Sequence, residues 1–139
     1  MAKVLLRRAF PDWRVDSAGL IAVVGAPAEP HAIEALGELG SELHDHRARQ
    51  LDVEQILSAD LILTMTRSQK DEIEHITPWA RGRVFRMGEW DGFDIDDPYR
   101  QPLEAFQRTR QLLESTLESW KPRLTAIVSP TLQGLSHGA

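Results

Sequence analysis

One short run of residues, Asp96-Asp97-Pro98-Tyr99, offers acid–base chemistry. A carboxyl group can give a proton to a departing oxygen and, once ionised, can take a proton from an attacking water, so one aspartate can serve both steps. Asp and Pro also favour turns for local reasons, so this run taken alone is usually a simple turn. His46 is the second candidate, because imidazole exchanges protons near neutral pH, although a lone histidine is more often a surface or core residue.

Composition excludes several kinds of chemistry. The chain has 139 residues, the size of one domain, and contains no cysteine, which excludes disulfides, thiolate metal sites and a cysteine nucleophile within this polypeptide. The net charge of -5 provides no basic field for nucleic acid or for an anionic membrane surface. No apolar run approaches the roughly 20 residues of a membrane span, so we expect a cytoplasmic protein without membrane insertion.

Helical and strand patterns alternate along the chain, which predicts a small α/β layer fold with a parallel sheet. Strands are expected over residues 13–16, over the near-continuous apolar run 60–65, and over 83–87. Helices are expected over residues 2–9, 30–40 with Gly40 as the C-cap, 52–57 with Asp52 as the N-cap, 68–77 with a capping box of Ser68 and Asp71, and from 102 onward. The last helix should bury one apolar stripe: Leu103, Phe106, Leu113, Leu117 and Trp120.

Several blocks occur together and in order: Met1-Ala-Lys-Val-Leu-Leu-Arg-Arg8, Val15-Asp-Ser-Ala-Gly-Leu20, His46-Arg-Ala-Arg-Gln-Leu51, Ala59-Asp-Leu-Ile-Leu-Thr-Met65 and Asp97-Pro-Tyr-Arg100. In combination they resemble the bacterial low-molecular-weight protein tyrosine phosphatases of the exopolysaccharide-associated type. The resemblance covers about residues 1–124. We therefore expect a phosphatase domain over 1–124 and a disordered tail over 125–139.

The resemblance implies a three-layer α/β fold with a small parallel sheet, of the phosphotyrosine phosphatase I type. Family members open with an apolar strand and a Cys-x5-Arg-Ser-Pro loop, followed by a helix similar to residues 1–8. The loop supplies the nucleophilic cysteine and, with the helix N-terminus, cradles the phosphate. We therefore expect this chain to lack both that loop and the family's central first strand, and to be catalytically inactive as written.

Site residues follow from the same resemblance. Asp97 matches the aspartate that protonates the leaving phenolate and later activates water, whereas the neighbouring Asp96 lacks the matching position before Pro98. Tyr99 matches an aromatic wall of the phosphotyrosine cleft. His46 matches a histidine that supports the phosphate loop by hydrogen bonding. The reaction needs no metal and no cofactor, and the implied partner is a phosphotyrosine protein such as a bacterial tyrosine kinase.

Loss of a central strand would leave two backbone edges facing a gap, so we expect marginal stability, self-association through these edges, or closure of the gap by sliding strands. Three functional hypotheses remain open at this point. The natural protein begins upstream and is a working phosphatase; the chain is a phosphatase-shaped binding module or a gene remnant; or it is a thiol-dependent arsenate reductase of the same fold. The absence of cysteine makes the third hypothesis the weakest.

Overall fold

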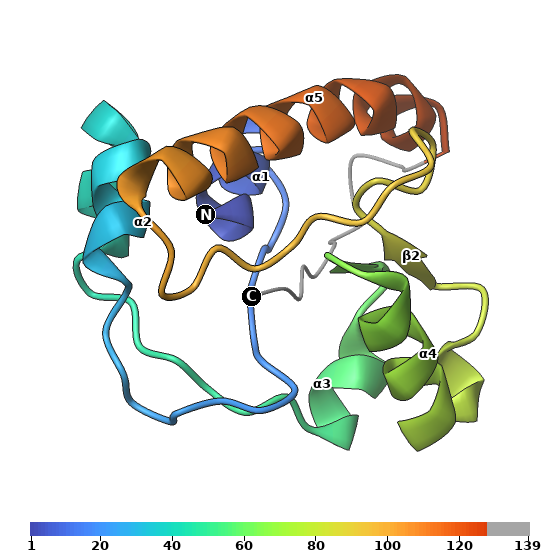
Figure 1. The fold of residues 1–139 in the computed structure, drawn as a ribbon. Coiled ribbons are helices and arrows are strands. Elements are labelled where there is room, and N and C mark those ends of the chain that lie inside the picture. The colour runs from blue at the N-terminus through green and yellow to red at the C-terminus, as the bar shows by residue number, and fades with distance from the viewer. Residues whose placement is uncertain (128–139) are drawn as a thin grey trace.

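The computed structural model describes residues 1–127, which form helices around a small sheet (Figure 1). The long helix α5 (Leu103–Ile127) crosses above α1 (Ala2–Ala9). Helix α2 (Pro30–Ala35) packs against one end of α5. The remaining elements are the 3-10 helices η1 (Gly37–Leu43) and η2 (Pro78–Ala80), the helices α3 (Val53–Ser58) and α4 (Arg67–Ile76), and the strands β1 (Ile62–Thr64) and β2 (Val84–Arg86). The predicted α/β class is confirmed.

The sheet of the described chain consists of β1 and β2, which pair in parallel with Ile62 opposite Val84. All of β1 is buried, as its uninterrupted apolar run predicted. The strands expected over 60–65 and 83–87 are therefore confirmed, although each is shorter than its pattern.

The larger core cluster lies between the sheet and α5, and a second one packs Ile56 of α3 and Ile73 of α4 against Ile62 of β1. Leu113, Leu117 and Trp120 of α5 are buried on one stripe, as predicted. Val4 and Leu5 of α1 are buried in the same cluster. Helix α5 continues to Ile127, beyond the domain boundary expected at residue 124, and residues 128–139 of the expected tail lie outside the described residues.

Two helix boundaries differ from their predictions. The helix expected over 30–40 ends at Ala35, because Gly37 adopts a φ of +59°, and Gly40 lies inside η1 instead of capping an α-helix. The N-cap of α4 is Thr66, which forms a capping box with Gln69; the expected pair of Ser68 and Asp71 was wrong. The prediction of Asp52 as the N-cap of α3 is confirmed by its bond from the N–H of Gln55, at 2.8 Å.

The strand expected over residues 13–16 was wrong, because this segment pairs with no other strand of the described chain. A strand needs a neighbouring backbone, and here Val15 C=O instead accepts hydrogen bonds from the Arg7 side chain. Sliding of this segment onto β1, one of the expected outcomes, does not occur in the structure.

Gly40→Ala should destabilise the fold by about 2–3 kcal/mol, because the added Cβ would overlap the backbone carbonyl of Ile33. The free energy of unfolding in urea measures the change. Gly19→Ala is the matched control: its Cβ would meet the Cβ of Ala22 at 3.4 Å, an ordinary contact. An equal loss in both variants would show that the close approach at Gly40 is unimportant.

Candidate active site

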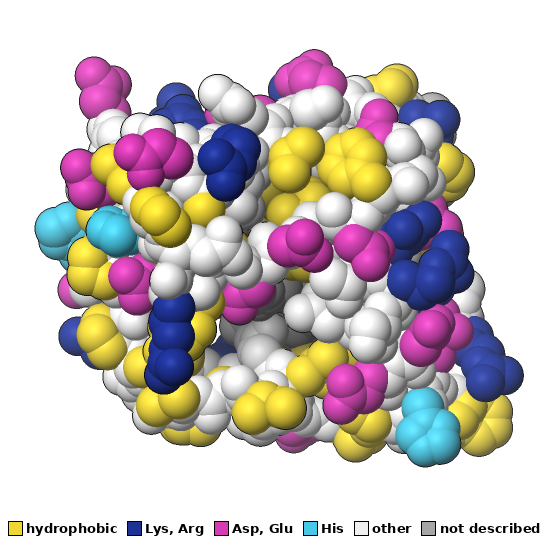
Figure 2. Space-filling view, in the orientation of Figure 1, with side chains coloured by type: hydrophobic (Ala, Val, Ile, Leu, Met, Phe, Trp, Pro, Cys, Tyr) yellow, Lys and Arg dark blue, Asp and Glu magenta, His cyan; other side chains and the backbone are white. Residues whose placement is uncertain are grey.

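A cavity of about 390 Å³ opens between the N-terminus of α1 and the chain segment that precedes α5. Figure 2 shows the hollow on this face, with acidic and hydrophobic side chains at its rim. Residues from distant parts of the sequence line the cavity, among them Lys3, Ser17, His46, Met65, Asp96, Asp97, Tyr99 and Phe106. The structure thus brings the three predicted site residues, His46, Asp97 and Tyr99, to one cavity.

Asp97 lies on one wall of the cavity with an exposed side chain. Its Oδ1 accepts a hydrogen bond from the N–H of Tyr99 at 3.0 Å, which fixes the carboxylate over the turn that Pro98 begins. The other carboxylate oxygen makes no hydrogen bond within residues 1–127. The run therefore forms a turn and also lines the cavity.

The segment that carries Asp97 is anchored by Asp94 and Ile95. Asp94 Oδ1 accepts hydrogen bonds from Arg86 Nη1 at 3.0 Å and from the N–H of Arg67 at 3.1 Å. Ile95, which is 1% exposed, donates its N–H to the carbonyl of Met65 at 2.9 Å. The hydrogen bond from Arg86 is the main reason that the pKa of Asp94 is lowered. No sequence pattern had indicated this anchor.

Asp94→Asn should loosen residues 96–100 while leaving the fold intact, because it removes the ionised acceptor of two hydrogen bonds. Asp94 is partly exposed, so we expect a loss of only about 1 kcal/mol in stability. Cleavage after Arg100 by trypsin should become about tenfold faster. Asp91→Asn is the control. Asp91 lies in the same loop as Asp94 and accepts a hydrogen bond from Ser119 Oγ, but it is not part of the anchor. Unchanged cleavage in Asp94→Asn would contradict this role.

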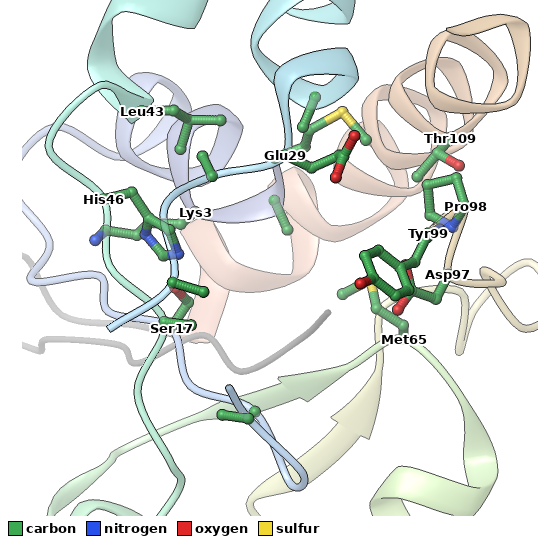
Figure 3. Close-up of a pocket in the computed structure, with 18 of the residues that line it drawn as sticks. Lys3, Ser17, Glu29, Leu43, His46, Met65, Asp97, Pro98, Tyr99 and Thr109 are labelled. Carbon is green, nitrogen blue, oxygen red and sulfur yellow. The ribbon is translucent and has the colours of Figure 1, made fainter. Parts of the chain in front are cut away.

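Lys3 and His46 line the opposite wall of the cavity (Figure 3). Burial is the main cause of the lowered pKa of Lys3, and the positive charge of Arg7 adds to it. Burial also lowers the pKa of His46, and the charge of Lys3 contributes in the same direction. His46 is therefore neutral at pH 7. Lys3 was not among the predicted site residues, because one lysine in an amphipathic helix carries no signal of its own.

The lowered pKa of His46 predicts a pH dependence of stability. The unfolded chain, with an ordinary histidine pKa near 6.5, binds the proton before the folded chain does. The contribution of His46 is therefore complete above about pH 7 and is lost as the pH falls through its folded pKa. His46→Gln should make the fall in unfolding free energy below pH 6.5 less steep. The control, His44→Gln, should leave that fall unchanged. Identical curves for His46→Gln and the parent chain would refute the prediction.

Tyr99 stands at the cavity mouth beside Asp97, with 57% of its surface exposed (Figure 3). The guanidinium of Arg100 lies 5.3 Å from the centre of its ring, and Arg100 adopts a positive φ of 63°. A flat ring in this position can stack against an aromatic substrate group. The cavity therefore offers a carboxylate and an aromatic ring on one wall and positive charge on the other.

Within residues 1–127, no group of three or more His, Cys, Asp or Glu side chains is placed to hold a metal ion. None of the described helices combines the length and apolar character needed to cross a membrane. The fold and the cavity together define a small α/β protein in which Asp97 and Lys3 line one cavity at the start of helix α1.

Comparisons with known proteins identify the family. Residues 1–129 match the family described as low molecular weight phosphotyrosine protein phosphatase. The chain is 42% identical over 127 residues to the probable low molecular weight protein-tyrosine-phosphatase EpsP of Ralstonia nicotianae, covering 91% of this chain and 88% of the relative. It is 39% identical to Wzb of Escherichia coli K12 over 126 residues, with coverages of 90% and 86%.

Solved structures agree with this result. The phosphatase Wzb from Escherichia coli K30, in complex with sulphate, superposes with a TM-score of 0.82 at 36% identity, covering 88% of this chain and 87% of that one. The YwlE arginine phosphatase from Geobacillus stearothermophilus gives a TM-score of 0.78 at 31% identity, with coverages of 90% and 82%. The chain belongs to the low molecular weight phosphotyrosine protein phosphatase family.

Proposed function

We propose that this chain carries the proton-transfer and substrate-positioning residues for hydrolysis of phosphotyrosine monoesters, with Asp97 as the general acid and base. The observation that supports the proposal most is that Asp97, Tyr99 and His46 line one cavity at the N-terminus of α1. In this assignment Tyr99 stacks against the substrate ring. His46 supports the loop that binds phosphate, consistent with its neutral state.

The chemistry explains why an aspartate is needed. The leaving phenolate has a conjugate acid with a pKa of about 10, so it departs poorly unless a proton is transferred to its oxygen as the P–O bond breaks. Asp97 gives that proton and becomes a carboxylate. It then takes a proton from the water that attacks the phosphoryl group, which returns the aspartate to its acid form. One residue thus serves both half-reactions.

We further propose that the 139-residue polypeptide does not turn over substrate by itself. The phosphoryl group must pass to a thiolate in the mechanism that the family resemblance implies, and the chain contains no cysteine. The alternative function is a binding module for phosphotyrosine, favoured by the cavity that Lys3, Asp97 and Tyr99 line. In either case the proposed partner is a cytoplasmic phosphotyrosine protein such as a bacterial tyrosine kinase.

A two-part experiment tests these proposals. The chain itself should release no nitrophenol from 4-nitrophenyl phosphate. The same chain extended before Met1 by an apolar strand and a Cys-x5-Arg-Ser-Pro loop should gain turnover, and serine in place of the added cysteine should abolish it. Turnover by the unextended chain would overturn the proposed incompetence. An extended chain that folds and binds phosphate but shows no turnover would overturn the role of Asp97.

Substrate class is measured on the same extended chain. Phosphotyrosine and phosphoarginine peptides of one sequence should be compared, because one structural neighbour is an arginine phosphatase. We expect phosphotyrosine to be preferred, since Tyr99 provides a ring at the cavity mouth. Preference for phosphoarginine would reassign the substrate while leaving the proton-transfer role of Asp97 intact.

A further inference from the structure

Asp97 lies at the start of a tight turn that Gln101 closes. The N–H of Gln101 donates to the carbonyl of Pro98 at 2.9 Å, and the side-chain amide of Gln101 donates to the carbonyl of Asp97 at 3.4 Å. The bond from the Tyr99 N–H to Asp97 Oδ1 also lies inside the turn. These contacts fix the shape of residues 97–101, but they do not fix the position of the turn relative to the cavity.

His31 of α2 joins this turn to another part of the fold. Its Nδ1 lies 3.3 Å from the carbonyl oxygen of Gln101. A carbonyl oxygen can only accept a hydrogen bond, so Nδ1 must carry the proton and donate it. Within residues 1–127, no other hydrogen bond links residues 97–101 to a residue outside the turn. The polar attachment of the turn to the described chain therefore depends on His31.

The ring of His31 is itself held in place. It meets the ring of Phe106 edge to face, with 5.5 Å between the ring centres. Phe106 is 4% exposed, belongs to the first turn of α5 and lines the cavity. Arg110 of α5 donates through Nη1 to the carbonyl of Ala35 at 3.0 Å, which ties the end of α2 to α5. The imidazole of His31 thus has a fixed position from which to bind the turn.

Backbone strain in the turn makes this attachment important. Arg100 adopts a φ of 63°, a region that residues with a Cβ rarely occupy, so its conformation costs energy. Strained conformations persist only where the surrounding contacts maintain them. Relaxation of Arg100 would displace Gln101, which is bonded to both Asp97 and Pro98. The carboxylate of Asp97 would then lose its fixed place at the cavity wall.

We propose that His31 is a positioning residue: its Nδ1–H binds the carbonyl of Gln101 and thereby sets the position of the Asp97 carboxylate. The consequence for proton transfer rests on the proposed function of Asp97, whereas the effect on the turn does not. The Nδ1–H is present in the imidazolium as well as in one neutral tautomer, so the contact survives protonation of the ring.

Proteolysis of the 139-residue chain tests the attachment. In His31→Leu, trypsin should cleave the Arg100–Gln101 bond at least tenfold faster than in the parent chain, because the turn is released. His31→Asn keeps an N–H donor near the place of Nδ1, so cleavage should stay within about threefold of the parent rate. His75→Leu, at an exposed histidine of α4, is the control and should leave the rate unchanged. Unchanged cleavage in His31→Leu would overturn the proposal.

The tautomer of His31 gives a second readout, which a role in packing alone would not determine. Nitrogen NMR of the parent chain should show the neutral ring of His31 with its proton on Nδ1. A bare Nδ1 would overturn the contact. This measurement decides the matter even if His31→Leu unfolds, as circular dichroism would reveal.

Kinetics of the chain extended by the Cys-x5-Arg-Ser-Pro loop test the consequence for proton transfer. His31→Leu should lower kcat for phenyl phosphate about tenfold with KM almost unchanged, and His31→Asn should restore kcat. If Asp97→Asn lowers kcat and His31→Leu does not, the positioning role is overturned while Asp97 remains the general acid. If neither variant lowers kcat, the proposed function fails, and cleavage and tautomer alone decide the attachment of the turn.

Discussion

Replacing Asp97 by asparagine should lower kcat/KM for phenyl phosphate by about 100- to 1,000-fold in the chain extended by a Cys-x5-Arg-Ser-Pro loop. Asparagine keeps the shape of the side chain and its acceptor for the Tyr99 N–H, at 3.0 Å in the parent, but cannot donate an acidic proton. The phenolate must then depart without protonation. The loss should therefore appear in the chemical step and leave phosphate binding almost unchanged.

A series of aryl phosphates separates this role from a structural one. The loss should be largest for phenols of high pKa and small for 4-nitrophenol, because a good leaving group needs little protonation. Asp96→Asn, on the neighbouring carboxylate of the same cavity, is the matched control and should cost less than about threefold. If Asp97→Asn lowered kcat/KM by the same factor for every aryl phosphate, Asp97 would not be the general acid.

Trp120→Ala should destabilise the fold by about 3–5 kcal/mol, which is a large part of a domain's stability. Trp120 is 2% exposed and donates its Nε1–H to the carbonyl of Met87 at 2.7 Å. Its ring also meets the rings of Phe85 and Trp90 edge to face, at 5.7 and 5.3 Å between centroids. The substitution therefore removes core volume and leaves a buried carbonyl without its partner.

Urea denaturation measures this effect. Trp120→Phe should cost less, about 1–3 kcal/mol, because it keeps an aromatic ring and loses only the hydrogen bond and part of the contact area. Trp79→Ala is the control for loss of a tryptophan, since Trp79 is 83% exposed and should cost no more than about 0.5 kcal/mol. Similar losses for Trp79 and Trp120 would refute the proposed packing role.

The sequence predicted correctly those elements that a strong apolar pattern or a helix cap marks. The apolar run 60–65 identified β1, and Asp52 identified the start of α3, because capping depends on residues within one turn. The pattern at 13–16 failed for the opposite reason: a strand exists only through its neighbour, and no described strand pairs with this segment. The prediction for the end of α2 was wrong because the positive φ of Gly37 ends the helix before Gly40.

Some residues of the candidate site could be predicted from the sequence and others could not. Asp97, Tyr99 and His46 were found through the family resemblance, and their roles stay predictions. Composition and spacing alone could not place them at one cavity, since His46 and Asp97 come to line it only through the fold. The anchor between Arg86 and Asp94 was missed because an arginine in a strand and an aspartate in a loop carry no joint sequence signal.

The segment between Ile95 and α5 is fixed at both ends. Its entry is held by the bond from Ile95 to Met65, and its exit is held where α5 begins at Leu103. The segment can therefore be lengthened around Asp97, because the cost of a longer loop between fixed ends grows only slowly with its length. The acid-bearing stretch is thus the natural position at which directed evolution could alter reactivity while the scaffold keeps its stability.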